Sequence, residues 1–171
     1  MIAVATIAYY PAVPARSKIT LKAVLLAQLE AALATARAAH TAAVEGATHA
    51  EARPENDKDT RGLEQSYLAR GVAQRAAELE AAVAAIAGWQ PRTFASDAAI
   101  AVGALVEVDD DGRARHFLVA GHGGGLALPG EVMVVTPSSP IGRALLGRRV
   151  DDDCEVDLGG GRRTLSITAV E

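Results

Sequence analysis

Ten residues from Glu51 to Thr60, with the sequence EARPENDKDT, bring several carboxylates close together. Four of the ten are acidic, and three of these, Glu55, Asp57 and Asp59, occupy alternate positions. A carboxylate just before a helix can cap its first turn and favour its positive N-terminal end. A capping acid can still point a free oxygen outward, toward another molecule. Whether the segment is only a solvent-exposed connector or takes part in the function depends on the elements that position it.

Long alanine-rich stretches flank this segment on both sides. Residues 18–49 contain no proline and one glycine, and residues 60–87 have a similar helix-favouring composition. Apolar residues recur there at alternating spacings of three and four, which predicts the seam of an antiparallel coiled-coil hairpin. The seam positions are Leu25, Leu29, Ala32, Ala36, Ala39 and Ala43, then Val72, Ala76, Leu79, Val83 and Ile86. If Leu25 lies opposite Ile86, the pivot falls near Glu55. Such an arm is roughly 45 Å long, at ~1.5 Å per residue, and too thin for a catalytic cleft of its own.

Composition excludes several classes of protein. The formal net charge is -4, and the acidic excess lies after residue 90, which argues against a protein that coats nucleic acid. One cysteine, Cys154, excludes an intramolecular disulfide and a cysteine-rich zinc site. The single cysteine favours a reducing, cytoplasmic setting. No apolar run approaches the ~20 residues of a membrane span, so we expect a soluble protein without a membrane partner. Residues 1–16 lack the basic start of a signal peptide, and we expect them to form a disordered leader.

After residue 90 the period of the apolar residues changes to two, which is typical of strands. The strands are predicted at residues 99–108, 114–120, 131–136, 154–158 and 164–170. Between the third and the fourth, SSPIGRALLG predicts a short helix with Ser139 as its N-cap, Pro140 at its first position and Gly147 at its end. The predicted fold class is α+β. An N-terminal antiparallel coiled-coil hairpin over residues 17–90 precedes an antiparallel sheet with one short helix over residues 91–171.

The stretch SSPIGRALLGRRVDDDCEV, from Ser138 to Val156, resembles the signature S-P-[LI]-G-x-A-L-L-G-x-x-x-G-D of Gre-type bacterial transcript cleavage factors. The residues on the signature are Ser139, Pro140, Ile141, Gly142, Ala144, Leu145, Leu146, Gly147 and Asp152. Asp151 stands where the signature has glycine, which indicates a different turn. The stretch EARPENDKDTRGLEQSYLARGVAQRAAELEAAV is similar to the tip and returning helix of the Gre hairpin. The resemblance implies an FKBP-like fold for the C-terminal domain.

The resemblance also implies a transcription elongation factor that is an accessory protein and no enzyme by itself. In Gre factors the globular domain docks on the rim of the secondary channel of bacterial RNA polymerase, through a loop that matches Ser139, Pro140 and Ile141. The coiled coil reaches down the channel to the 3′ end of backtracked RNA. Two acids at its tip help the polymerase to hold its second Mg²⁺, a hard cation that prefers oxygen ligands, and the polymerase then hydrolyses the RNA. No intrinsic cofactor is implied.

The acidic tip matches the family motif G-D-L-x-E-N only in part. An ungapped alignment places Glu55 on the first acid and Lys58 on the second, with Asp57 and Asp59 on either side. Three interpretations stay open. A pair drawn from Glu55, Asp57 and Asp59 stimulates cleavage, or the protein is a non-cleaving relative that restrains polymerase, or the aspartates only cap the returning helix.

Arginines on the returning helix have two interpretations. Arg61, Arg70 and Arg75 either face RNA or the channel wall, or pair at the surface with Glu64 and Glu78.

Two further features of the sequence could indicate other functions. An arm on an FKBP-like body could instead serve as an interaction module for another client, although an apolar tip would suit that role better. The segment His122–Gly125 resembles part of an esterase oxyanion hole, but the sequence has no G-x-S-x-G nucleophile, and we interpret the glycines as a flexible turn. Aspartates 109–111 are interpreted as a turn with Gly112.

Overall fold

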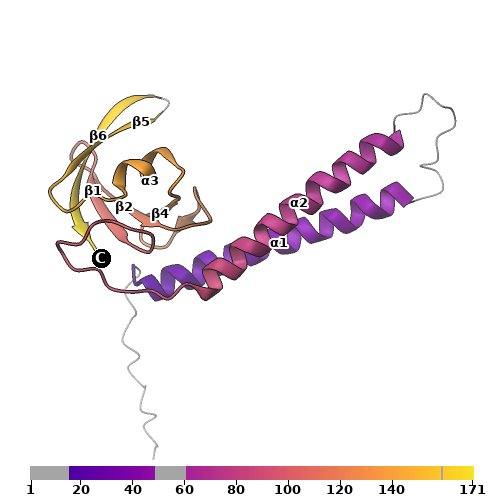
Figure 1. Cartoon of the computed structure of the whole chain (residues 1–171), viewed down its shortest axis with the longest axis horizontal. Coiled ribbons are helices and arrows are strands. Elements are labelled where there is room, and N and C mark those ends of the chain that lie inside the picture. The colour runs from indigo at the N-terminus through magenta and orange to yellow at the C-terminus, as the bar shows by residue number, and fades with distance from the viewer. Residues whose placement is uncertain (1–15, 49–60, 159) are drawn as a thin grey trace, which may run out of the picture.

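The computed structural model describes residues 16–48, 61–158 and 160–171, and their side chains except at 46–48, 61–66 and 158. The elements in chain order are α1 (Lys18–Thr48), α2 (Arg61–Gly88), β1 (Leu105–Asp109), β2 (Ala114–Val119), β3 (Ala127–Leu128), β4 (Val132–Val135), α3 (Pro140–Leu145), β5 (Asp153–Leu158) and β6 (Gly161–Val170). The strands and α3 form a compact body, and α1 and α2 form an arm that extends from it (Figure 1). The expected leader, up to residue 15, and the acidic segment both lie outside the described residues.

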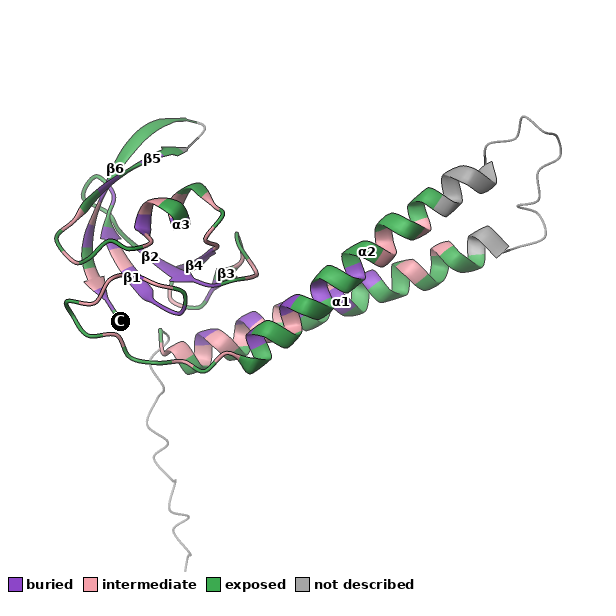
Figure 2. Ribbon diagram, in the orientation of Figure 1, coloured by how far each residue is buried: buried purple, intermediate pink, exposed green. Residues whose placement is uncertain are grey.

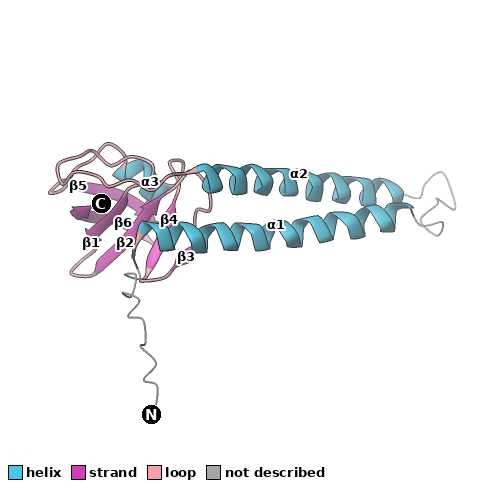
Figure 3. Cartoon of the chain, turned by 90° about the horizontal axis from the view of Figure 1, so that it is seen from below, coloured by secondary structure: helices cyan, strands magenta, loops and turns pink. Residues whose placement is uncertain are grey.

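The arm consists of α1 and α2 packed antiparallel along their lengths (Figure 3). Leucines of α1 recur every four residues on the inner face, where Leu21, Leu25, Leu29 and Leu33 are buried. Across the arm, an exposed ion pair joins Arg37 to Glu80 with 2.7 Å between Nη2 and Oε1. The predicted hairpin is confirmed.

The seam differs in detail from the predicted one. Leu33 and Ala82 are buried although they were not assigned to the seam, and Ala39 is exposed although it was. Ala39 faces Gly71 and Val72 across a shallow groove, because side chains this small do not fill the space between two helices. By length and composition alone, Lys18–Glu45 could span a membrane, but a helix that packs within a protein core passes the same test. The leucines of α1 already pack within such a core.

The sheet of the body has six strands in the order β3-β4-β2-β1-β6-β5. The fold class is confirmed, with one difference from the prediction: the sheet is mixed, because β2 and β4 pair in parallel. The reason is the two-residue strand β3, which the sequence did not predict. It pairs antiparallel with β4 at the sheet edge, so the chain returns through β4 in the direction of β2. The predicted strand 99–108 begins only at Leu105.

Alternate residues of the central strands build two cores on opposite faces of the sheet. In Figure 2 much of the central strands is buried, whereas much of α2 is exposed. On one face, Leu105 of β1 and Leu118 of β2 pack in the same core as the inner residues of the arm. On the other face, Val106 of β1 and Phe117 of β2 pack with Leu145 of α3. The arm therefore shares a core with the sheet, and α3 covers the opposite face.

At the end of the arm nearest the body, polar contacts join α1 to the end of α2, and one close approach joins α1 to the body. Lys22 Nζ of α1 donates to the carbonyl oxygens of Ala87 (2.8 Å) and Trp89 (2.6 Å), which the end of α2 leaves without helical partners. Leu25 of α1 lies against Gly123, where a Cβ would be 2.6 Å from Leu25 Cδ1 and φ is +82°. The glycine-rich segment is thus a seat for α1, which the interpretation as a flexible turn did not predict.

Candidate functional site

The loop before α3 is fixed by its own hydrogen bonds. Ser139 is the N-cap of α3, and its Oγ accepts from the Gly142 N–H at 3.0 Å while donating to the Thr136 carbonyl oxygen at 2.8 Å. The Ser139 N–H donates to the same carbonyl at 2.9 Å. The predicted cap is confirmed, and with Pro140 at the start of α3 it holds the loop in one conformation.

The three residues predicted to dock on a partner differ in exposure. Pro140 is exposed, Ser139 is half-buried by its capping role, and Ile141 is half-buried against the core that contains Leu145. Arg143 Nη1 also donates to the carbonyl oxygen of Ser138. The loop therefore presents a small, preorganised surface centred on Pro140.

The turn after α3 contains a residue with positive φ. Asp151, at the position where the Gre signature has glycine, adopts φ +70°, the left-handed conformation that glycine adopts most readily. Its N–H donates to the Ile167 carbonyl oxygen at 2.9 Å. Asp152 Oδ2 accepts from the Arg149 N–H at 2.8 Å. Asp151 thus adopts a backbone conformation that glycine adopts more readily than other residues.

The predicted tip acids Glu55, Asp57 and Asp59 lie outside the described residues. In the sequence they fall between the end of α1 at Thr48 and the start of α2 at Arg61. Both of these helix ends are at the end of the arm that is farthest from the body (Figure 1).

The predicted arginines lie along α2. Arg61 is its first residue, and its side chain is outside the described ones. Arg70 is exposed. Arg75 is also exposed, and its Nη1 lies 3.7 Å from Glu78 Oε2, the surface pairing that the sequence analysis offered as one of two interpretations.

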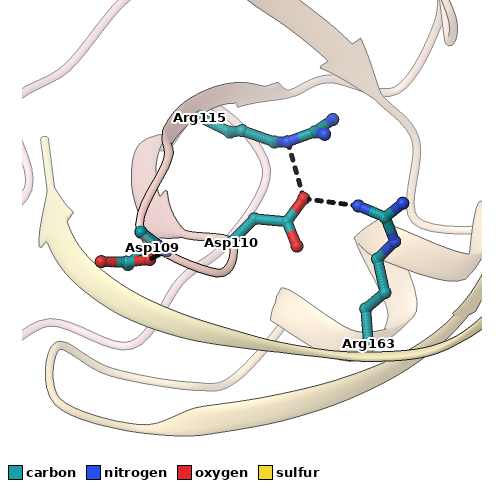
Figure 4. A network of polar contacts seen from close by, with 5 residues as sticks. Asp109, Asp110, Arg115 and Arg163 are labelled. Carbon is teal, nitrogen blue, oxygen red and sulfur yellow. Dashed lines mark hydrogen bonds and ion pairs between the residues drawn. The ribbon is translucent and has the colours of Figure 1, made fainter.

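A buried carboxylate in the body was missed from sequence. Asp110 is 4% exposed, and its Oδ2 accepts from Arg115 Nε at 2.7 Å and from Arg163 Nη1 at 3.1 Å (Figure 4). Its neighbour Asp109 accepts from the Gly112 N–H at 2.6 Å, so the predicted turn is confirmed. The cluster joins the β1–β2 turn to β6. No local pattern distinguishes Asp110 from its neighbours, because the two arginines come from different strands.

A second polar cluster lies on the face of the sheet that packs against the arm. Glu107 Oε1 accepts from Thr168 Oγ1 at 3.0 Å, and Glu107 Oε2 is 3.0 Å from His116 Nε2. These hydrogen bonds, that of Thr168 first, hold the pKa of Glu107 below its usual value because they stabilise the charged carboxylate. Both clusters tie neighbouring strands together.

The described residues form two parts, a body and an arm (Figure 1). Within residues 16–48, 61–158 and 160–171 there is no group of three or more His, Cys, Asp or Glu that could hold a metal ion. The described residues instead form an ordered surface loop on a body and a long arm seated on that body.

The comparisons with known proteins match about half of the chain. The family model "Transcription elongation factor, GreA/GreB, C-term" matches residues 95–171. The transcription elongation factor GreA of Sphingopyxis alaskensis is 31% identical over 81 residues, which are 47% of this chain and 49% of that protein. GreA of Zymomonas mobilis is 32% identical over 81 residues, with the same shares. The chain thus spans about half the length of the curated relatives it matches. The C-terminal domain of this chain is thus similar to that of GreA/GreB transcription elongation factors, in agreement with the resemblance of the sequence.

Two solved structures align with most or much of this chain, but with low TM-scores. The crystal structure of GreA factor homolog 1 (Gfh1) of Thermus thermophilus has a TM-score of 0.39 and 25% identity, over 89% of this chain and 95% of that chain. GreA/GreB from Nitrosomonas europaea has a TM-score of 0.36 and 18% identity, over 63% of this chain and 90% of that chain. Both scores are below 0.5, so neither structure adds to the sequence matches.

Proposed function

We propose that this protein binds bacterial RNA polymerase at its secondary channel and stimulates cleavage of backtracked RNA. The observation that supports the proposal is a GreA/GreB C-terminal domain with a two-helix arm seated on it. The described helices of that arm end far from the body (Figure 1), and the acidic segment joins them in the sequence. With 28 residues in α2, the arm is roughly 40 Å long at ~1.5 Å per residue. An arm of this length can carry acids into an active site that the body itself cannot enter.

The two parts have separate tasks in this proposal. The loop of Ser139, Pro140 and Ile141 docks the body on the polymerase. A pair of acids drawn from Glu55, Asp57 and Asp59 supplies oxygen ligands to the Mg²⁺ of the polymerase. The polymerase performs the hydrolysis, so the protein needs no cofactor and no catalytic cleft, and it acts in the cytoplasm.

A second candidate function rests on Lys58. An ungapped alignment to the Gre tip motif places this lysine where the second acid belongs. A cation at that position would repel Mg²⁺, and the protein would then occupy the channel and restrain the polymerase without stimulating cleavage. Both candidates share the docking step and differ only in what the tip does.

The test uses a stalled, backtracked polymerase complex with labelled RNA and Mg²⁺. We compare the wild-type protein with Glu55→Ala, Asp57→Ala and Asp59→Ala. Glu30→Gln is the matched control, because Glu30 is an exposed acid on the same arm but far from the acidic segment. Under the first candidate, wild type and Glu30→Gln accelerate cleavage equally, and one or two of the tip variants lose the effect while still binding polymerase.

Other results separate the alternatives. Tight binding with slowed RNA synthesis and no cleavage favours the restraining factor, and Lys58→Glu should then introduce cleavage. Pro140→Ala should weaken binding in either case, because Pro140 is the exposed centre of the docking loop. Absence of polymerase binding by the folded wild-type protein would refute both candidates and leave the interaction module with another client.

A further inference from the structure

Lys18, the first residue of α1, lies in a pocket at the junction of arm and body. The pocket has a volume of about 430 Å³ and is lined by the start of α1, by residues of the segment 91–96 and by Val170 and Glu171. The Lys18 side chain is half-buried, and Nζ donates to the Arg92 carbonyl oxygen at 2.8 Å. A neutral amine can keep this donated hydrogen bond and still has its lone pair free to react.

Two cations share one aromatic ring in this pocket. Lys18 Nζ lies 4.6 Å from the centroid of the Phe94 ring, and Arg92 Cζ lies 4.8 Å from the same centroid. Burial lowers the pKa of Lys18 to about 8, with Glu171 opposing the shift and Arg92 adding to it. At pH 8 about half of such amines are neutral, whereas a lysine of ordinary pKa is neutral in less than ~1% of molecules. The site therefore combines an amine that is partly neutral near pH 8 with a guanidinium over the same aromatic ring.

We propose that Lys18 is a modification site at which small acyl phosphates acylate the amine. The lone pair of the neutral Nζ attacks the acyl carbon, and a C–N bond forms. The bond between the acyl carbon and the phosphate oxygen breaks, its electron pair leaves with the phosphate, and the nitrogen loses one proton to water. The Arg92 guanidinium attracts the phosphate of the donor and stabilises the phosphate that leaves. An uncharged acyl donor would gain nothing from Arg92, so the expected donors are anionic.

Acylation would change the junction as well as the side chain. The product is a neutral amide, which loses the attraction of Lys18 to the Phe94 ring and to the Glu171 carboxylate. One N–H remains that can reach the Arg92 carbonyl. The start of α1 would thus be held less firmly to the segment that connects α2 to the body. This consequence does not depend on the proposed binding to RNA polymerase.

The experiment compares lysines within one molecule. The full chain is incubated with acetyl phosphate at pH 7.5, and acetylation is followed at each lysine by peptide mass spectrometry. Lys22 is the matched control, because it lies one turn further along α1 and also donates to backbone carbonyl oxygens. We expect Lys18 to be acetylated at least ~10-fold faster than Lys22, with a rate that rises through pH 8 and then levels off.

Two variants of the pocket should act in opposite directions. Arg92→Gln removes the neighbouring cation, keeps the backbone carbonyl and should slow acetylation of Lys18 several-fold. Glu171→Gln removes the carboxylate that favours the charged amine and should accelerate it. Lys22 should be unaffected by both. The proposal is refuted if Lys22 reacts as fast as Lys18 in the wild-type protein, or if neither variant changes the rate at Lys18.

Discussion

Replacing Gly142 by alanine tests whether the docking loop is held by backbone packing. Gly142 is buried in α3, and an added Cβ would overlap the main-chain carbonyl oxygen of Thr136 and lie 2.8 Å from its carbonyl carbon. The clash is with backbone, so rotation of a side chain cannot relieve it. Thr136 accepts two hydrogen bonds from Ser139 through the same oxygen, and any movement of Thr136 therefore weakens the cap of α3 as well.

The expected cost combines these two effects. Overpacking of a tight site costs about 1 to 3 kcal/mol, and loss of an N-cap costs about 0.5 to 2 kcal/mol. We expect Gly142→Ala to lower the free energy of unfolding by about 3 kcal/mol. In an ordinary helix the same change would be stabilising by up to about 1 kcal/mol, because alanine has the higher helix propensity. The sign of the effect is thus as informative as its size.

Urea denaturation provides the measurement, followed by far-UV circular dichroism and by the fluorescence of Trp89. Trp89 is the only tryptophan of the chain and lies at the junction, where a Cβ on Gly103 would be 3.1 Å from its indole nitrogen. Gly71→Ala is the matched control, since Gly71 is exposed in α2 and an added Cβ would meet nothing within 4 Å. It should stabilise the protein by about 0.5 to 1 kcal/mol. A free energy of unfolding of Gly142→Ala within about 0.5 kcal/mol of wild type would refute the backbone clash.

Three further predictions concern the body. Asp110→Ala should lower the free energy of unfolding by about 2 to 3 kcal/mol in urea titrations, because it leaves two arginines without their shared carboxylate; an effect below about 0.5 kcal/mol would contradict this. Because the pKa of Glu107 is lowered in the folded protein, its contribution to stability is present above its ordinary pKa and is lost as pH falls through the folded-state pKa. Thr168→Val should raise the folded-state pKa of Glu107, and equal NMR titrations of Glu107 in both proteins would exclude the hydrogen bond as the cause. Cys154 is 2% exposed, and burial raises the pKa of its thiol. A thiol reagent at pH 8 should therefore react at least about 100-fold faster with the protein unfolded in urea than with the folded protein, and rapid labelling of the folded protein would contradict the burial.

The arm was predictable because the signals that build it are local. Helix-favouring composition and apolar spacing predicted helices at residues 18–49 and 60–87, and the structure has Lys18–Thr48 and Arg61–Gly88. The cap of α3 was equally local, since Ser139, Pro140 and Gly142 lie within four residues of one another. Each of these features depends on contacts between residues that are close in sequence.

The features that were missed depend on distant residues. The strand Ala127–Leu128 is too short for any alternation to show, and its pairing decides that β4 runs parallel to β2. Asp110 is buried because Arg115 and Arg163 converge on it from two strands, and residue 163 is 53 positions away. The acids between α1 and α2 remain predictions from sequence, because they lie outside the described residues.

The contact between α1 and the glycine-rich segment of the body sets the direction of the arm, and so the position of its far end. At roughly 40 Å from the body, a rotation of about 10° at the root of the arm displaces its far end by roughly 7 Å, more than the length of any ion–oxygen bond. The angle is set where Leu25 lies against Gly123 and where Gln28 Nε2 donates to the Ala127 carbonyl oxygen at 3.0 Å. A side chain at position 123 would have to displace the end of the Leu25 side chain and would be strained by the φ of +82°. The proposed delivery of carboxylates to a metal ion therefore constrains the contacts at the root of the arm as strictly as the acids themselves.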